Sequence, residues 1–213
     1  MTTLRELNPD QAVRALTNLA EGTDRAIVGI TGAPGAGKST VAKTLARRCI
    51  ARGIPTVVVP MDGFHLAQAV LDARGWAGEK GAPHTFDGSG YVALVERIRR
   101  ERRWSVWAPT FERTLEDPVA GSIEVTAQTR LVITEGNDLL SPEEPWSDLP
   151  GLLDEAWYVD TPDQLRLDWL IARRRRYGAS MQEATDLALG PDERNAELVR
   201  AARCRADALL QVG

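Results

Sequence analysis

Apolar and polar positions repeat along this chain in two ways, one typical of buried strands and the other of amphipathic helices. Several short runs rich in β-branched residues have the length expected of strands, and Val57, Val58 and Val59 suit a parallel strand buried on both faces. These runs are 26–31, 56–60, 122–126, 130–134 and 156–159. Between them, apolar residues recur every three or four positions, which predicts helices. Strands that alternate with helices predict an α/β fold in three layers, with a mostly parallel central sheet.

The helical pattern also sets several local expectations. Helices are predicted at 9–19, 38–52, 66–73, 90–102, 162–176 and 191–206. Thr161 is expected to cap the fifth of these, with Pro162 as its first residue and Gln164 as the reciprocal capping partner. The same helix is expected to turn Leu165, Trp169 and Leu170 inward. A loop is expected at 109–118, and the glycine-rich stretch 75–90 is long enough to form a mobile substrate loop.

Composition narrows the class of protein. The 213 residues suit one domain, 1–213, with a sizeable core. Cys49 and Cys204 are too few and too far apart for a disulfide framework, which favours a reducing compartment. No run approaches the roughly 20 apolar residues of a membrane span, and the start has no apolar core like that of a signal peptide. The expectation is a cytoplasmic protein that does not bind membranes.

Charge argues against nucleic acid as a partner. The formal net charge is −4, whereas non-specific nucleic-acid binding depends on excess positive charge. Five arginines crowd residues 97–103, but the apolar residues of helix 90–102 lie at helical spacing on the opposite face. These apolar residues are Tyr91, Leu94, Val95 and Ile98. The arginine cluster is therefore interpreted as the solvated face of a helix.

The strongest motif is GAPGAGKST at residues 32–40. It has the spacing G-x-x-x-x-G-K-S, directly after a predicted strand and directly before a predicted helix. In such a turn the backbone N–H groups close around nucleotide phosphates, and the helix dipole adds positive potential. Lys38 is expected to reach the β- and γ-phosphates, and the Ser39 hydroxyl to bind Mg²⁺. The predicted ATP-binding residues are Gly32, Ala33, Pro34, Gly35, Ala36, Gly37, Lys38, Ser39 and Thr40.

Three acidic residues follow predicted strands, where ligands bind in open α/β sheets. Asp62 follows strand 56–60, Glu135 follows strand 130–134, and Asp160 follows strand 156–159. Phosphoryl transfer needs Mg²⁺ and a carboxylate that orients or deprotonates the attacking hydroxyl, and Asp62 and Glu135 could divide these roles. An Asp-Gly turn is the weaker alternative for Asp62, and a plain strand-end carboxylate is the weaker alternative for Glu135. Asp160 stands just before the expected cap, which favours a structural role.

The order of motifs resembles a known family. GAPGAGKST, MDGFHL, PHTFD, APTFER, ITEGN and ARRRRYG are similar to the P-loop kinases that include uridine kinase, phosphoribulokinase and bacterial-type pantothenate kinase. The resemblance covers residues 26 to about 210 and is greatest to bacterial nucleoside or fructose kinase-like proteins. It implies the P-loop fold with an arginine-rich lid, ATP and Mg²⁺ as cofactors, and a small-molecule acceptor. It also allows a homodimer, although no segment demonstrates an interface.

The resemblance assigns roles to individual residues. It implies that Asp62 is the base toward the acceptor hydroxyl, that Glu135 lies near Mg²⁺, and that Arg173 and Arg176 belong to the lid. The ending NAELVRAARCRAD brings in Asn195, Arg203 and Arg205 as nucleotide or substrate contacts, although surface salt bridges explain the two arginines equally well. The expected substrate-binding residues are His65, His84, Phe86, Asp87, Phe111, Arg113 and Asn137. The aromatic ones would form walls, and the charged ones would contact a hydroxyl or phosphate.

Two positions depart from the family's pattern. Asp138 replaces the aromatic residue that usually follows E-G-N, and His84 replaces an acidic residue in P-x-T-F-D. Both lie where the acceptor is expected, so its identity stays open. His84 is also compatible with an ordinary loop position, and His65 with local packing.

The sequence therefore predicts an ATP- and Mg²⁺-dependent kinase that phosphorylates a hydroxyl of a sugar, a nucleoside or a pantothenate-like alcohol. One alternative is a nucleoside-monophosphate kinase, although MDGFHL stands where that class would place an arginine for the acceptor phosphate. A GTP-dependent switch is disfavoured because N-K-x-D is absent from the sequence. A catalytically silent NTP-binding module stays open.

Overall fold

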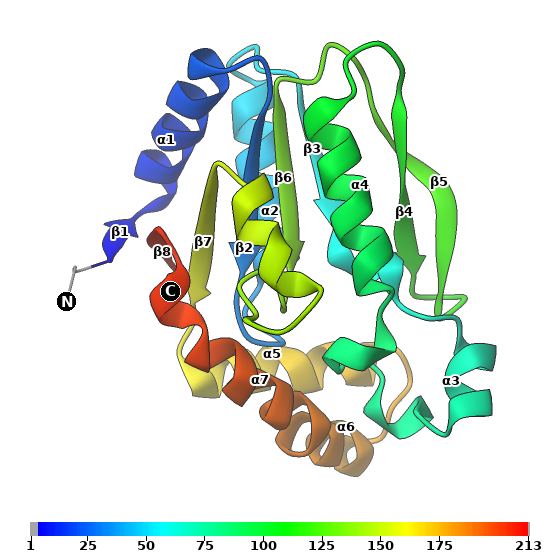
Figure 1. Cartoon of the computed structure of the whole chain (residues 1–213). Helices are drawn as coiled ribbons and strands as arrows, with labels where there is room; N and C mark the ends of the chain where they lie inside the picture. The colour runs from blue at the N-terminus through cyan, green and yellow to red at the C-terminus, as the bar shows by residue number, and fades with distance from the viewer. Residues whose placement is uncertain (1–3, 213) are drawn as a thin grey trace.

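The structure, a computed structural model, describes residues 4–212. At its centre these residues form a parallel sheet with the strand order β1-β8-β7-β2-β6-β3 (Figure 1). The strands are β1 (Arg5–Leu7), β2 (Ala26–Thr31), β3 (Thr56–Pro60), β6 (Leu131–Gly136), β7 (Glu155–Asp160) and β8 (Ala208–Gln211). The parallel sheet that the sequence predicts is thus confirmed.

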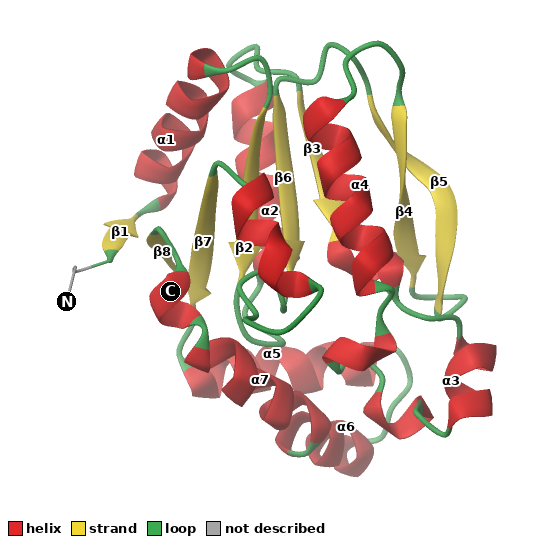
Figure 2. Ribbon diagram, viewed as in Figure 1, coloured by secondary structure: helices red, strands yellow, loops and turns green. Residues whose placement is uncertain are grey.

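Helices cover both faces of the sheet, which makes three layers (Figure 2). One apolar core joins α1 (Pro9–Gly22) and α2 (Lys38–Ile50) to one face. A second core joins α4 (Gly88–Arg100) and the 3₁₀ segment Trp146–Leu152 to the other face. Neighbouring residues of β2 enter different cores, Val28 the first and Ile27 the second. This is the period-two alternation of a strand covered on both sides.

The remaining helices lie at the carboxyl ends of the strands or beside them. Figure 1 shows α5 (Asp163–Arg176), α6 (Met181–Leu189) and α7 (Pro191–Ala201) crossing below these ends, with the short α3 (Gln68–Arg74) to one side. Short 3₁₀ turns occur at Met61–Phe64, Ala77–Glu79, Pro83–Thr85 and Arg203–Arg205. Three helices therefore lie at the end of the sheet where open α/β folds bind their ligands.

The prediction of a loop at 109–118 is wrong. Strands β4 (Val106–Glu112) and β5 (Asp117–Val125) form an antiparallel hairpin in a sheet of their own. Pro109 and Pro118 suggested a loop because proline lacks the N–H that a central ladder needs. In a two-stranded hairpin each strand has a free edge, and the register shifts between Ala108 and Thr110, so both prolines are accommodated.

Other differences concern the ends of the chain and helix α5. Strands β1 and β8 and helix α6 were not predicted, and the helix expected at 191–206 ends at Ala201. The Thr161 hydroxyl donates to the carbonyl of Ala36 instead of capping α5, whose N-cap is Pro162 without a side-chain bond. In α5, Leu170 is buried as expected but Trp169 is 39% exposed.

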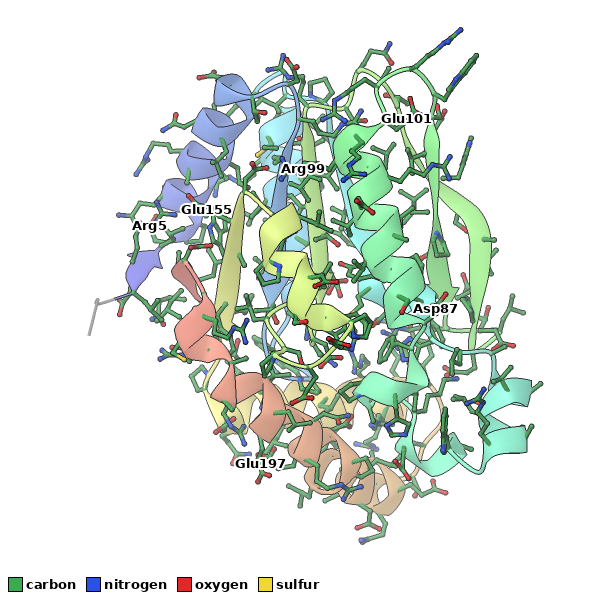
Figure 3. All side chains as sticks on the ribbon, in the orientation of Figure 1. Arg5, Asp87, Arg99, Glu101, Glu155 and Glu197 are labelled. Carbon is green, nitrogen blue, oxygen red and sulfur yellow. The ribbon has the colours of Figure 1, made fainter. Side chains whose placement is uncertain are left out.

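Buried and surface arginines hold the layers together at several points. The Arg25 side chain is 1% exposed and donates to four carbonyls, those of Thr129, Ile98, Glu101 and Thr126. Figure 3 labels Arg5 beside Glu155, an ion pair of 2.5 Å that joins β1 to β7. Within residues 4–212, no helix combines the length and the apolar character needed to cross a bilayer.

Candidate active site

The phosphate-binding motif forms a tight loop between β2 and α2. Gly35 and Gly37 have φ angles of 83° and 86°, in the left-handed region that glycine favours. A Cβ on Gly35 would lie 2.7 Å from the backbone oxygen of Arg166, too close for any side chain. Helix α5 therefore packs directly on the outside of the loop and requires glycine at position 35.

The loop presents donors toward a ligand. Among the described residues, no acceptor takes the backbone N–H groups of Gly37, Lys38, Ser39 and Thr40, which form the N-terminus of α2. The Lys38 ammonium donates to the carbonyls of Gly32 and Ala33 and to Asn137 Oδ1, at 2.9, 3.1 and 2.7 Å. Burial lowers the pKa of Lys38. This cradle of N–H groups and one lysine has the chemistry of a polyphosphate site.

The end of β6 contributes two side chains to the same place. Ser39 Oγ donates to Glu135 Oε1 at 2.8 Å. Two residues after Glu135, the amide oxygen of Asn137 accepts from Lys38. Burial raises the pKa of Glu135, and the nearby charge of Asp62 raises it further. A hydroxyl and a carboxylate are the oxygen ligands that suit Mg²⁺, which commonly takes only one or two protein ligands beside phosphates. Ser39 and Glu135 could thus hold this ion.

Within residues 4–212, no cluster of three or more His, Cys, Asp or Glu side chains could hold a metal ion.

Asp62 lies in the 3₁₀ turn that follows β3. The neighbouring Gly63 makes room for the hairpin, because a Cβ there would lie 2.5 Å from the backbone oxygen of Pro109. This close approach places Arg113, at the hairpin tip, with its Nη2 3.5 Å from Asp62 Oδ2. His65 Nδ1 lies 2.8 Å from the backbone oxygen of Asp62. Burial lowers the pKa of His65.

Most of the predicted site residues line one cavity of about 950 Å³. The predicted residues in its lining are Pro34, Gly35, Gly37, Lys38, Ser39, Thr40, Asp62, His65, Phe86, Phe111, Arg113, Glu135, Asn137 and Arg173. Asn195 of α7 also lines it and donates to the carbonyl of Gly81 at 3.1 Å. The cavity thus brings together the phosphate loop, the end of β3, the hairpin tip and two of the helices below the sheet.

Three predicted substrate or lid residues do not line this cavity. His84 pairs with Glu79 at 3.2 Å, and its ring meets Trp76 edge to face. Asp87, labelled in Figure 3, caps α4 by accepting from the Gly90 N–H. Arg176 is exposed on the last turn of α5. Each of the first two has a local partner that accounts for its position.

Three predicted positions of the phosphate loop and one near the end of the chain also lie outside the cavity lining. Gly32, Ala33 and Ala36 do not line the cavity, but their carbonyls accept from Lys38 or from Thr161. Arg203 pairs with Asp160 at 2.6 Å, in agreement with a structural role for Asp160.

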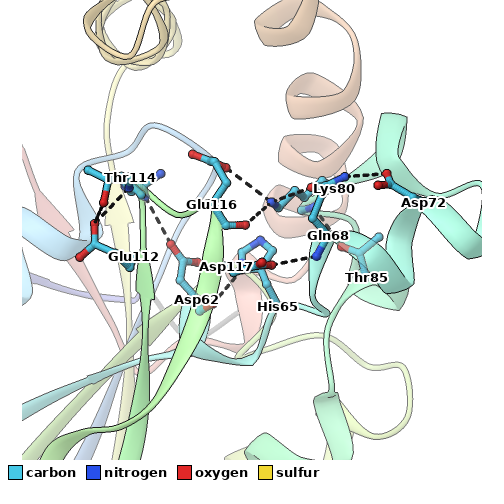
Figure 4. A network of polar contacts seen from close by, with 12 residues as sticks. Asp62, His65, Gln68, Asp72, Lys80, Thr85, Glu112, Thr114, Glu116 and Asp117 are labelled. Carbon is cyan, nitrogen blue, oxygen red and sulfur yellow. Dashed lines mark hydrogen bonds and ion pairs between the residues drawn. The ribbon is translucent and has the colours of Figure 1, made fainter.

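Sequence reasoning missed several cavity residues. Lys80, Arg174 and Asp192 line the cavity, and Arg174 Nη2 donates to Asp192 Oδ2 at 2.6 Å. Lys80 donates to Gln68 Oε1 and to the backbone oxygen of Glu116, at 3.0 and 2.8 Å (Figure 4). No motif identifies Lys80, because its contacts arise only when the 75–87 segment meets the hairpin. Arg174 lies within the motif ARRRRYG, but its pairing with Asp192 depends on how α5 packs on α7.

Comparisons with known proteins bear on this geometry. "Putative uridine kinase C227.14" of Schizosaccharomyces pombe is 34% identical over 159 residues, which is 70% of this chain and 66% of that protein. "Uncharacterized protein YggC" of Escherichia coli is 35% identical over 82% of this chain and 73% of its own length. A crystal structure described as a "putative fructose transport system kinase" from Silicibacter sp. TM1040 is 35% identical, with a TM-score of 0.83 over 95% of this chain and 98% of that one.

The chain belongs to the P-loop small-molecule kinases of the uridine kinase, phosphoribulokinase and pantothenate kinase group. This P-loop kinase spans about half the length of the pantothenate kinases it matches, such as 52% of that of Paenarthrobacter aurescens at 30% identity. It shares its fold with the phosphoribulokinase of Rhodobacter spheroides, at a TM-score of 0.65 and 17% identity, over 88% of this chain and 70% of that one. A family model described as "Methylmalonyl Co-A mutase-associated GTPase MeaB" matches residues 1–65 of this P-loop kinase, the part that contains the phosphate loop.

Proposed function

We propose that this chain is an ATP- and Mg²⁺-dependent kinase that phosphorylates a hydroxyl of a small metabolite, such as a sugar, a nucleoside or a pantothenate-like alcohol. One observation carries the proposal: the phosphate loop and the carboxylate of Asp62 line the same cavity. A nucleotide site alone would not require a carboxylate across from Lys38 and beside an aromatic wall. Phosphoryl transfer requires both, because the nucleotide and the acceptor must meet.

The nucleotide side is assigned to the phosphate loop. The N–H groups of residues 37–40 and the Lys38 ammonium hold the phosphates, and Ser39 and Glu135 hold Mg²⁺. When bound, Mg²⁺ neutralises charge on the phosphates. Asn137 orients Lys38 through the 2.7 Å bond to its ammonium. Among the lid arginines we assign the phosphate contact to Arg173, which lines the cavity.

The acceptor side is assigned to Asp62 and its neighbours. The acceptor oxygen forms a bond to the γ-phosphorus while the bond from that phosphorus to the bridging oxygen of ADP breaks. The hydroxyl proton passes to the Asp62 carboxylate, so that ADP and a phosphate ester leave. His65, Phe86 and Phe111 provide the wall against which the carbon skeleton lies, with ring centroids 4.1 and 4.8 Å from His65.

Asp62→Asn tests the base role. The amide is nearly equal in volume but cannot take the proton, so kcat is expected to fall by about 10²–10⁴-fold. The Kd for ATP, measured by calorimetry, is expected to change little because the phosphate loop is intact. ADP release is assayed against nucleosides, ketoses, aldoses, pantothenate and glycerate.

Asp24→Asn is the matched control, since Asp24 is exposed and does not line the cavity. Turnover by Asp62→Asn at the wild-type rate would remove Asp62 from the base role. An equal loss of ATP binding and turnover would assign Asp62 to the metal–nucleotide complex.

A further inference from the structure

Most of the charges around the cavity are paired within the protein. Arg174 pairs with Asp192 at 2.6 Å, and Lys80 lies near the carboxylate of Glu116 and donates to two neutral oxygens. The three ammonium hydrogens of Lys80 thus have three acceptors, which leaves none for a ligand. Lys80 therefore joins the 75–87 segment to the hairpin tip (Figure 4).

Arg113 differs from these cations. Its guanidinium has five N–H donors, and within the described residues its hydrogen-bond partner is Asp62, at the long distance of 3.5 Å. The side chain is 37% exposed and lines the cavity. Arg113 can therefore offer a planar pair of donors to a ligand beside Asp62, the geometry that carboxylate and phosphate groups fit.

Arg173 lies near the same place as Arg113, because burial lowers the pKa of Arg173, the charge of Arg113 lowers it further, and the charge of Asp62 opposes this. Arg173 is the cation whose charge lowers the pKa of Lys38, beyond the effect of burial. Lys80 and Arg113 are the cations whose charges lower the pKa of His65, again beyond burial. Arg113 is thus the arginine that lies beside both Asp62 and the aromatic wall, with its guanidinium 5.9 Å from the Phe111 ring.

The rings of the aromatic wall leave no space between them for a stacked nucleobase. The His65 ring has Phe86 at 4.1 Å and Phe111 at 4.8 Å between centroids, so the three rings pack on one another. Lys80 and the Arg113 guanidinium lie 5.0 and 5.9 Å from the Phe111 ring. No base fits between rings this close, whereas a short aliphatic skeleton can lie against them.

We infer that the acceptor is a small hydroxylated anion, whose carboxylate or phosphate binds Arg113 while its hydroxyl lies at Asp62. This inference rests on the proposed kinase function and narrows its acceptor. Because the two side chains are 3.5 Å apart, the anionic group and the hydroxyl are separated by only a few carbon atoms. Short polyhydroxy acids and small sugar monophosphates fit this description, and nucleosides and neutral sugars do not.

The test compares anionic acceptors with their neutral counterparts. Glycerate, ribose phosphate, glycerol, ribose and uridine are assayed for ADP release with ATP and Mg²⁺. The best acceptor is expected to be an anion, and the two anions distinguish a carboxylate from a phosphate. Arg113→Gln is expected to raise KM for that anion about 10- to 100-fold, the loss of a charged hydrogen-bond pair. KM for ATP is expected to stay within about twofold, and Arg113→Lys to restore part of the loss.

Arg100→Gln is the control, because Arg100 is exposed on α4 and pairs with Glu96. The inference would be overturned if neutral acceptors supported ADP release as well as the anions do. It would also be overturned if Arg113→Gln raised KM equally for neutral and anionic acceptors. If no acceptor is turned over, calorimetric binding of glycerate and ribose phosphate in the presence of ADP decides. Binding of an anion by the wild type that is lost in Arg113→Gln supports the inference. Equal binding by both proteins, or no binding by the wild type, overturns it. The proposed kinase function is judged separately, from ATP binding and ADP release.

Discussion

Asp138 is the residue whose environment departs most from expectation. It is 5% exposed and its Oδ2 has no hydrogen-bond partner among the described residues. Burial raises its pKa to about 7, opposed by the charge of Lys38 and assisted by that of Asp62. A carboxyl in this position keeps its proton near neutrality, because ionisation would leave a buried charge without a partner.

This burial predicts a pH dependence of stability. In the unfolded chain Asp138 ionises near its ordinary value of 3.8, whereas in the folded protein it keeps its proton up to about 7. The unfolded state binds fewer protons in between, so the free energy of unfolding falls as pH rises from about 4 to 7, by up to about 1.4 kcal/mol per pH unit. Asp138→Asn cannot ionise and lacks this contribution.

Urea denaturation of both proteins at pH 5 and pH 7.5 checks this. The difference between variant and wild type is expected to shift in favour of Asp138→Asn at the higher pH, while contributions from other groups cancel in the comparison. Parallel pH profiles would contradict the assignment.

Among the elements, α5 has the most consequences for the site. Arg166 is 1% exposed and donates to the carbonyl of Pro34 at 3.2 Å, and it also pairs with Glu193 of α7. Glu193 in turn accepts from Arg200 at 2.5 Å. One buried guanidinium thus links the phosphate loop to two helices below the sheet.

Arg166→Met is expected to loosen the phosphate loop without touching the acceptor side. KM for ATP should rise about tenfold, in line with the loss of a charged hydrogen bond. KM for the acceptor should stay unchanged. Arg200→Met is the matched control, since it removes the other partner of Glu193 but keeps the contact to Pro34. Initial-rate kinetics with each substrate varied in turn separate the two outcomes. A similar effect of both variants would show that the helix network matters and the loop contact does not.

Sequence reasoning was accurate where local pattern decides the structure. Strand 26–31 was placed correctly because an unbroken apolar run before a glycine-rich turn permits few alternatives. It failed where tertiary contacts decide, as at Thr161, whose hydroxyl bonds to Ala36 in the phosphate loop. Strands β1 and β8 are only three and four residues long, too short for a visible period.

The site shows the same division. Lys38 and Ser39 follow from spacing alone. The position of Arg113 depends on a hairpin that two prolines disguised in the sequence, and that of Lys80 on its contact with the hairpin tip.

At the scale of the whole molecule, the cavity joins parts that are distant in sequence. It is lined by the phosphate loop, the β4–β5 hairpin, α5 and α7. A nucleotide that contacts several of these parts binds the folded state only, so it is expected to raise Tm. The homodimer and the single domain 1–213 stay predictions.

At 100 times Kd, ATP with Mg²⁺ is expected to add about 2.7 kcal/mol, which is about 5–10 °C in Tm for a chain of this size. Lys38→Ala is expected to abolish turnover and most of this shift while circular dichroism stays unchanged. Arg47→Ala, on the exposed side of the same helix, is the control. Thermal melts with and without ATP measure the effect, and a full shift in Lys38→Ala would refute the assignment of the phosphate loop.

The contacts of Lys38 affect which anions can bind its ammonium group. An ammonium has three hydrogens, and here the carbonyls of Gly32 and Ala33 and the amide of Asn137 accept all three. Any incoming anion must compete with these internal partners before it gains the lysine. Chloride or a single free phosphate offers little in exchange, whereas a metal-bound polyphosphate offers many oxygens at once. The full strength of the lysine is therefore reserved for ligands that bring enough oxygens to replace its internal acceptors.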